Sequence, residues 1–190
     1  MSGAATYQQL LQKVIDEVIS PSAADVDHAA RFPRAAIDAM SKAGLLALIS
    51  SKDVGGMGES MRAASYVVEK IAEACGSTQM IVCMHYVATA VIEKHGAQAI
   101  RRDIAAGKHL ATLAFSEAGS RSHFWAPVGA AAQSNGHIFL DNKKSWVTSA
   151  DQADSYVWSS KPVAGDGAST TTFDSRGLAL EVQVLARQVD

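Results

Sequence analysis

Leu113-Ala-Phe-Ser-Glu-Ala-Gly-Ser-Arg-Ser-His123 opens a stretch of this chain that closes with Lys144-Ser-Trp-Val-Thr-Ser-Ala150. The opening segment has the pattern of an apolar strand that ends in small hydroxyl and glycine residues. The closing segment places Trp146 and Thr148 two residues apart on an expected strand, so both side chains would point to the same face. An aromatic wall beside a hydroxyl group suits a planar heteroaromatic ligand.

The second half of the opening segment is expected to be a loop that combines hydroxyl groups, glycine and one cation, namely Ser116, Gly119, Ser120, Arg121 and Ser122. Such a loop could offer backbone N–H groups, hydroxyls and a guanidinium to a phosphate. The alternative is that Trp146 is an ordinary core residue and that the Ser/Gly run is an ordinary loop. Short motifs have low specificity, so both interpretations stay open on the residues alone.

Composition excludes several classes of protein. The chain has 190 residues, of which 48% are hydrophobic and 19% charged, as expected for one large or two small globular domains. A net charge of -2 without a basic block argues against nucleic acid as a partner. No apolar run approaches the roughly 20 residues of a membrane span. The first nine residues lack a basic region followed by an apolar core, so we expect no secretory signal.

The two cysteines, Cys75 and Cys83, are expected to be free thiols, as in a cytoplasmic protein. Both lie in segments expected to be helical, and a spacing of eight residues separates them by about two turns, too far for a disulfide within one helix. A reducing cytoplasm is the natural location for such a chain. Neither cysteine has a histidine at metal-ligand spacing, so we expect no metal site.

The first part of the chain has the periodicity of helices. Helices are expected over 7–19, before Pro21, then from about Pro33 to Gly44, over 60–75, from a cap at Ser77 to Gly96, and over 98–106. The glycines of Asp53-Val-Gly-Gly-Met-Gly58 are expected to form a turn and not a phosphate loop, because no Lys-Ser/Thr pair follows them. His85 lies beside the apolar face of the fourth helix, formed by Met80, Ile81, Met84, Ala88, Val91 and Ile92, and is expected to be a core or interface residue.

The pattern changes at about Lys108. Strands are expected over 110–116, 128–133, 137–142, 155–160, 169–174 and 178–185, and Asn135-Gly136 is a strong two-residue hairpin signal. The sequence therefore predicts an α+β protein. An all-helical domain over 1–108 would precede a barrel-like or sandwich-like β domain over 109–190.

The order of these motifs resembles the acyl-CoA dehydrogenase family, over nearly the whole chain. In that family a Thr/Ser-Glu-Pro-Gly-Ala-Gly-Ser-Asp run and, after a hairpin, a Trp-Ile-Thr-Asn segment correspond to Ser116–His123 and Trp146–Ser149. The family's Gly-Leu and Gly-Gly-x-Gly loop is similar to Gly44-Leu-Leu and Gly55–Gly58. The resemblance implies a helical domain, a β middle domain and a C-terminal four-helix bundle, the last of which has no counterpart here.

The resemblance also implies roles for particular residues. Phe115 and Ser116 would lie against the ring of FAD, and Trp146 would pack on its isoalloxazine. The Thr148 hydroxyl would hydrogen-bond near flavin N5, and Ser122 would bind the pyrophosphate. Met84, with Met80 and Val87, would line the acyl-tail pocket, and Ser122 would also contact the acyl-CoA substrate.

Four residues depart from the family pattern: Ala118 replaces Pro, Ser120 replaces Ala, Arg121 replaces Gly and His123 replaces Asp. Arg121 would be strained where the family glycine needs a positive φ, or it could contact the pyrophosphate or the CoA phosphates. His123-Phe124-Trp125 could cover the substrate entrance or fold back as a surface loop. Glu117 belongs to the flavin motif and is no candidate for the catalytic base, so we name no catalytic residue.

Three functions follow as hypotheses. The first is part of an FAD-dependent acyl-CoA dehydrogenase, with the base and the rest of the FAD site on a missing C-terminal half or on a second polypeptide in a hetero-oligomer. The second is a flavin-dependent monooxygenase on the same scaffold. The third is a non-catalytic module that binds CoA, flavin or a protein partner.

Overall fold

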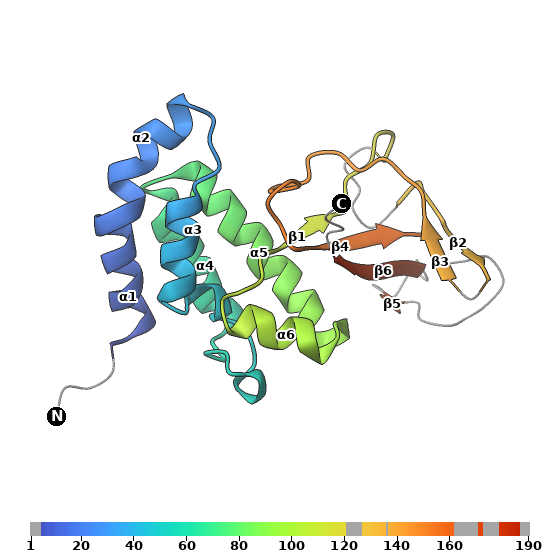
Figure 1. Ribbon diagram of the computed structural model, residues 1–190, viewed down its shortest axis with the longest axis horizontal. Coiled ribbons are helices and arrows are strands. Elements are labelled where there is room, and N and C mark those ends of the chain that lie inside the picture. The colour runs from blue at the N-terminus through green and yellow to red at the C-terminus, as the bar shows by residue number, and fades with distance from the viewer. Residues whose placement is uncertain (1–4, 121–126, 136, 162–170, 173–178, 187–190) are drawn as a thin grey trace.

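The computed structural model describes residues 5–120, 127–135, 137–161, 171–172 and 179–186 (Figure 1). The helices come first in the chain and the strands follow, so the α+β prediction is confirmed. Predictions that concern Arg121, Ser122 and His123 lie outside the described residues. No described helix is both long enough and apolar enough to cross a bilayer. The division into domains at 108/109 stays a prediction.

The N-terminal helical segment continues past Pro21, where the sequence predicted an end. α1 (Tyr7–Val14) starts at a capping box formed by Thr6 and Gln9, and a π-helical turn (Ile15–Ile19) joins it to α2 (Ser20–His28). Pro21 lies in the first turn of α2. A proline lacks the N–H of a regular helix and clashes with the carbonyl four residues before it, and a wider π turn at this point accommodates both defects.

Four more α-helices complete the helical part: α3 (Arg34–Lys42), α4 (Met61–Ala72), α5 (Gly76–His95) and α6 (Gln98–Ala105). α3 ends at Lys42, two residues before the predicted stop at Gly44, whose φ of +73° is the left-handed conformation common after a helix end. The cap of α5 differs from the prediction. Cys75 is its N-cap, because its thiol accepts a hydrogen bond from the Thr78 backbone N–H, and Ser77 lies inside the helix.

α5 lies between the helices that precede it in the chain and the sheet, in contact with α4 on one side and β1 on the other (Figure 1). Its buried residues are Thr78, Ile81, Val82, His85, Tyr86, Ala88, Thr89 and Ile92. The predicted apolar face is wrong at Met80, which is 47% exposed. A helix packed on two sides buries more than one stripe, so a single amphipathic face does not describe it.

The strands in the described part of the chain form two sheets. β1 (Ala111–Ala114) pairs in parallel with β4 (Ser155–Ser160), which pairs antiparallel with β6 (Ala179–Ala186), and β5 (Thr171–Thr172) pairs with the far edge of β6. The predicted hairpin is confirmed: β2 (Ala131–Ser134) and β3 (His137–Leu140) are antiparallel, with Ser134 opposite His137. A small apolar cluster of Ala88, Ile92, Ile104, Ala111 and Val157 joins α5 and α6 to the larger sheet.

Candidate functional site

An open pocket of about 290 Å³ lies where α5 meets the end of β1. Its lining is mostly apolar and comes from α5, from β1 and the residues after it, and from the segment after β3: Met84, Val87, Leu113, Phe115, Ser116, Ser145 and Trp146. The pocket therefore brings together Met84, Phe115, Ser116 and Trp146, four of the residues that the sequence predicted for flavin or substrate. Met80, the other methionine predicted here, is not among the lining residues.

Trp146 projects into solvent at the edge of this pocket. Its side chain is 94% exposed and its φ is +57°, a left-handed conformation that is uncommon for a residue other than glycine. The interpretation of Trp146 as a core residue is therefore wrong. So is the expectation that Trp146 and Thr148 lie on a strand, because 145–150 forms bends and turns and the alternation of a strand does not apply.

Thr148 contributes to the site through its backbone. The Thr112 hydroxyl on β1 donates a hydrogen bond of 2.7 Å to the Thr148 carbonyl oxygen, and the Ser145 N–H donates to the Ser116 carbonyl at 2.9 Å. These contacts hold the segment that carries Trp146 against the end of β1. The side chain of Thr148 is half-buried and does not line the pocket.

The described part of the Ser/Gly loop is a tight turn. The Ser120 hydroxyl donates to the Glu117 carbonyl at 2.9 Å, and Gly119 has a φ of +92°. Ser120 is 8% exposed, so its hydroxyl serves the loop itself. The predicted role of Ser122 stays a prediction.

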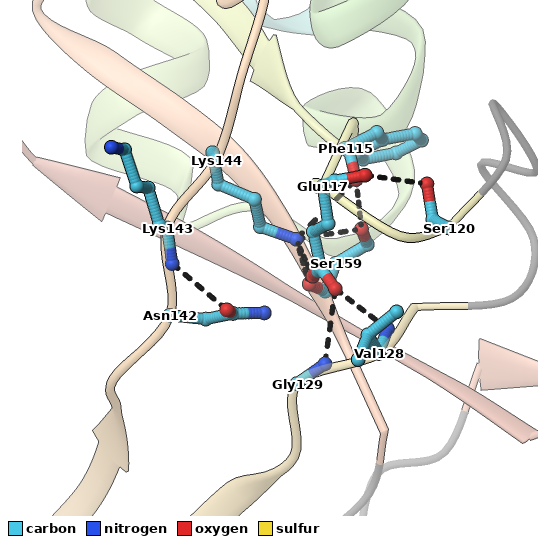
Figure 2. Close-up of polar contacts among 9 residues, drawn as sticks. All are labelled: Phe115, Glu117, Ser120, Val128, Gly129, Asn142, Lys143, Lys144 and Ser159. Atoms are coloured by element: carbon cyan, nitrogen blue, oxygen red, sulfur yellow. Dashed lines mark hydrogen bonds and ion pairs between the residues drawn. The ribbon is translucent and has the colours of Figure 1, made fainter.

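Glu117 and Lys144, which adjoin the lining residues Ser116 and Ser145 in the chain, form a buried ion pair, and their side chains are 1% and 3% exposed. Figure 2 shows the Lys144 ammonium between several acceptors: its Nζ is 2.5 Å from Glu117 Oε1 and 2.5 Å from the Ser159 carbonyl oxygen. The other carboxylate oxygen, Oε2, accepts hydrogen bonds from the Val128 N–H at 2.6 Å and the Gly129 N–H at 3.0 Å. Both charges are thus hydrogen-bonded, as a buried pair requires.

The pKa values of both groups follow from this environment. Burial raises the pKa of the Glu117 carboxyl, but the Lys144 ammonium and the two backbone N–H groups outweigh it and hold that pKa below its usual range. Burial lowers the pKa of Lys144, although the Glu117 carboxylate opposes the effect. A carboxylate that is ionised, engaged on both oxygens and closed to solvent is a poor proton acceptor, in agreement with the exclusion of Glu117 as a base.

Lys144 is the site residue that sequence reasoning missed. It follows Lys143, which is exposed, and nothing in the Lys-Lys pair distinguishes the buried lysine from the solvated one. Its pairing with Glu117 distinguishes it, but this pairing depends on a β-bridge between the segments at 117 and 144 and cannot be read from the sequence.

His85 is a core residue, as predicted. It is fully buried, its Nε2 lies 3.0 Å from the Leu46 carbonyl oxygen, and its Nδ1 accepts a hydrogen bond of 3.1 Å from the Ala111 N–H. The first contact needs a proton on Nε2 and the second needs none on Nδ1, so the geometry selects the neutral imidazole. Burial lowers the pKa of His85 to about 4.

The pocket has the chemistry of a site for a planar aromatic ring system. An exposed indole stands at its edge, a second aromatic ring and aliphatic side chains line it, and the Ser116 and Ser145 hydroxyls add hydrogen-bonding groups. No described residue in the lining is acidic, basic or a histidine, so these residues offer binding and orientation but no proton acceptor. The residues present therefore fit a flavin ring.

Comparison with known proteins gives one family. The sequence profile described as the acyl-CoA dehydrogenase N-terminal domain matches residues 4–107, more than half of the chain. The human mitochondrial short-chain specific acyl-CoA dehydrogenase is 31% identical over 160 residues, which are 80% of this chain and 39% of that protein. The chain thus spans about two fifths of the length of the curated relatives that it matches.

Solved structures with the same fold include enzymes of different activity. Butyryl-CoA dehydrogenase from Megasphaera elsdenii matches with a TM-score of 0.76 and 16% identity, over 98% of this chain and 50% of that one. Methanesulfinate monooxygenase from Pseudomonas fluorescens matches with a TM-score of 0.75 and 18% identity, over 96% and 43%. At this identity the likeness establishes the fold and leaves the reaction open.

Proposed function

Because this chain belongs to the acyl-CoA dehydrogenase family, we propose that it forms the helical and β parts of an FAD-dependent acyl-CoA dehydrogenase. The reaction would be α,β-dehydrogenation of an acyl-CoA thioester. The single observation that carries the flavin site is the 94% exposed Trp146 at the edge of an apolar pocket. An indole left in water beside a pocket lined by a second aromatic residue is a surface for stacking a ligand ring.

The flavin would be held by the residues that the pocket brings together. Phe115 and Trp146 exclude water from the ring, and Ser116 offers a hydroxyl to its polar edge. In this proposal the Thr148 hydroxyl lies near flavin N5 and Ser122 binds the pyrophosphate. FAD, when bound, supplies the hydride acceptor, and the protein positions the substrate and the ring relative to each other.

The acyl chain of the substrate would pack against α5. Met84 and Val87 line the pocket from that helix, and Leu113 lines it from β1. Methionine is flexible and polarisable, so Met84 can adapt to an aliphatic tail. The substrate class follows from this lining only through the family, and we therefore propose an acyl-CoA thioester without a chain length.

We assign the catalytic base to the part of the relatives that this chain does not cover. Dehydrogenation needs a proton to be taken from the α-carbon, and the described lining of the pocket holds no group for it. Glu117 is the nearest carboxylate in the motif, and its oxygens are engaged by Lys144, Val128 and Gly129. The proposal therefore includes a C-terminal half or a partner polypeptide that supplies the base and the rest of the FAD site.

A second candidate function is a flavin-dependent monooxygenase, because a methanesulfinate monooxygenase has the same fold. Anaerobic addition of a short-chain acyl-CoA to the flavin-loaded complex separates the two. Loss of the visible flavin absorbance identifies the dehydrogenase. Unchanged absorbance, with oxygenation of a substrate by the chemically reduced flavin and O₂, identifies the monooxygenase. If flavin binds under no condition, the chain is a binding module.

Trp146→Ala tests the site itself. Loss of an aromatic stacking partner costs about 1 kcal/mol, so we expect the Kd for FAD in the complex to rise about fivefold. The matched control is Phe139→Ala, which removes another exposed aromatic side chain, 52% exposed, from β3 outside the pocket lining. Equal FAD affinity of the Trp146→Ala and wild-type complexes would contradict the assignment, as would an equal loss in the control.

A further inference from the structure

We infer that Glu117 and Lys144 are a positioning pair that sets the separation of the two walls of the pocket. The inference rests on the proposed function in one respect, that the ligand held between the walls is the flavin ring. The first wall is Phe115 and Ser116, which directly precede Glu117. The second is Ser145 and Trp146, which directly follow Lys144.

The connection between pair and walls is covalent and short. The segments at 117 and 144 meet in an antiparallel β-bridge, and the Ser145 N–H donates to the Ser116 carbonyl at 2.9 Å. The ion pair links the same two segments, with Lys144 Nζ 2.5 Å from Glu117 Oε1 (Figure 2). In this inference, loss of the ion pair allows the residue before Glu117 to move relative to the residue after Lys144.

The pair is also tied to the sheet and to a third segment. Lys144 Nζ reaches the carbonyl oxygen of Ser159 on β4, and lies 4.8 Å from the centre of the Trp158 ring. Glu117 Oε2 binds the backbone N–H groups of Val128 and Gly129. One carboxylate thus holds the chain at 117 and again at 128–129, and one ammonium fixes both to the main sheet.

The energetics of such a pair favour a positioning role over a stabilising one. Two charges removed from water recover their desolvation cost only when every partner is in place, so the pair contributes little net stability. It is nevertheless specific, because removal of one partner leaves a buried charge without compensation. Neither side chain of the pair lines the pocket, so the pair acts on a bound ligand through the walls.

The test uses Glu117→Gln, which keeps the size of the side chain and removes its charge. The amide introduced there can accept from the Val128 and Gly129 N–H groups, but it then presents its NH₂ to Lys144. The first readout is ¹⁹F NMR of the full chain labelled with 5-fluorotryptophan, in which Trp146→Phe identifies the Trp146 signal among the three tryptophans. We expect this signal to shift or broaden, with a Kd for FAD in the complex about fivefold higher, similar to that of Trp146→Ala.

Two controls separate positioning from stability. Glu73→Gln removes the same type of charge from the exposed Lys70–Glu73 pair on the helical side and should leave both readouts unchanged. Ile71→Val, at a fully buried core position, lowers stability away from the pocket; measured well below its unfolding midpoint, it should leave the Trp146 signal in place. If Glu117→Gln does not fold, the Glu117→Gln/Lys144→Met double variant removes both charges and is judged by the same readouts.

The outcomes distinguish this inference from the proposed function. An unmoved Trp146 signal in a folded Glu117→Gln or double variant overturns the positioning role, whatever the flavin does. If the Trp146 signal moves in the variant and the wild-type complex binds no FAD, the positioning role is supported and the flavin is removed from the proposal. A moved signal with weakened FAD binding, and neither effect in the controls, supports both.

Discussion

His85 and Lys144 are two buried basic side chains that the fold keeps in opposite protonation states. His85 is held neutral because its two ring nitrogens serve one backbone acceptor and one backbone donor, and burial opposes a charge. Lys144 is held as an ammonium because a carboxylate and a carbonyl oxygen lie within 2.5 Å of it. At the scale of the residue, the partners decide the charge more than the side chain does.

The neutral state of His85 predicts a specific loss of stability in acid. Its pKa is 6.5 in an unperturbed state and about 4 in the folded chain, so between these values the unfolded chain binds a proton that the folded chain does not. Stability is therefore complete above pH 6.5 and falls as the pH drops towards 4. The difference corresponds to about 3 kcal/mol of unfolding free energy, measurable by urea denaturation at a series of pH values.

His85→Gln is the matched variant, because an amide can donate to the Leu46 carbonyl and accept from the Ala111 N–H without titrating. Its stability should fall less steeply than that of the wild type between pH 6.5 and 4. Parallel pH profiles for the two proteins would show that His85 is not the group responsible.

At the scale of the element, the loop of 50–58 is the clearest case of geometry imposed by close packing. It folds back on the segment after α3, where the Gly58 N–H donates to the Ser50 carbonyl at 2.8 Å and the Glu59 N–H donates to the Leu48 carbonyl at 2.9 Å. A Cβ on Gly56 would lie 2.1 Å from the Ser50 carbonyl oxygen. The sequence predicted a turn here, and this contact explains why the turn has no room for a side chain at Gly56.

Gly56→Ala should therefore destabilise the chain by about 2 kcal/mol or more, since backbone must move to admit the methyl group. Gly76→Ala is the matched control: it lies in the first turn of α5, and a Cβ there meets nothing within 4 Å. We expect this control to be neutral or stabilising by about 0.5 kcal/mol. The measurement is the urea unfolding midpoint of each variant. Similar midpoints for Gly56→Ala and Gly76→Ala would contradict the close contact at Gly56.

At the scale of the whole molecule, α5 and the pocket are the junction between the helices and the sheet. α5 contacts α4 and β1, and His85 connects the Leu46 carbonyl of the helical part to the Ala111 N–H of β1. The pocket opens at the same junction, and Trp146 is exposed at its edge. The pocket is open to solvent, and in the proposal its open side receives the rest of the FAD site.

This open side predicts how flavin is retained. The chain expressed alone should bind FAD weakly or not at all, and a complex with the polypeptide that supplies the remaining part of the relatives should elute yellow from a sizing column. The visible absorbance of each protein peak is the measurement. A stable but colourless complex would argue for the non-catalytic binding module, and a yellow isolated chain would remove the need for a partner in flavin binding.

The sequence by itself determined the features that depend on local interactions. Helical periodicity, the end of a helix near Gly44 and the hairpin at Asn135 are properties of short segments, and each was predicted. The core position of His85 also followed from its place beside an apolar helical face. Three of the predicted site residues, Phe115, Ser116 and Trp146, lie in the motifs that end β1 and follow the hairpin, and the pocket brings them together with Met84 from α5.

Only the tertiary structure decided which members of a local pattern are buried. Lys143 and Lys144 are neighbours of the same type, and a carboxylate from a distant segment selects the second. Trp146 matched a strand residue in pattern, yet a left-handed backbone turns it into solvent. Pro21 predicted a helix end, but in the structure a π turn precedes it and the helical segment continues. The π turn before Pro21 is a local adjustment of the backbone. For Lys144 and Trp146 the physical reason is shared: burial and pairing depend on contacts between segments far apart in the chain, and local periodicity carries no information about them.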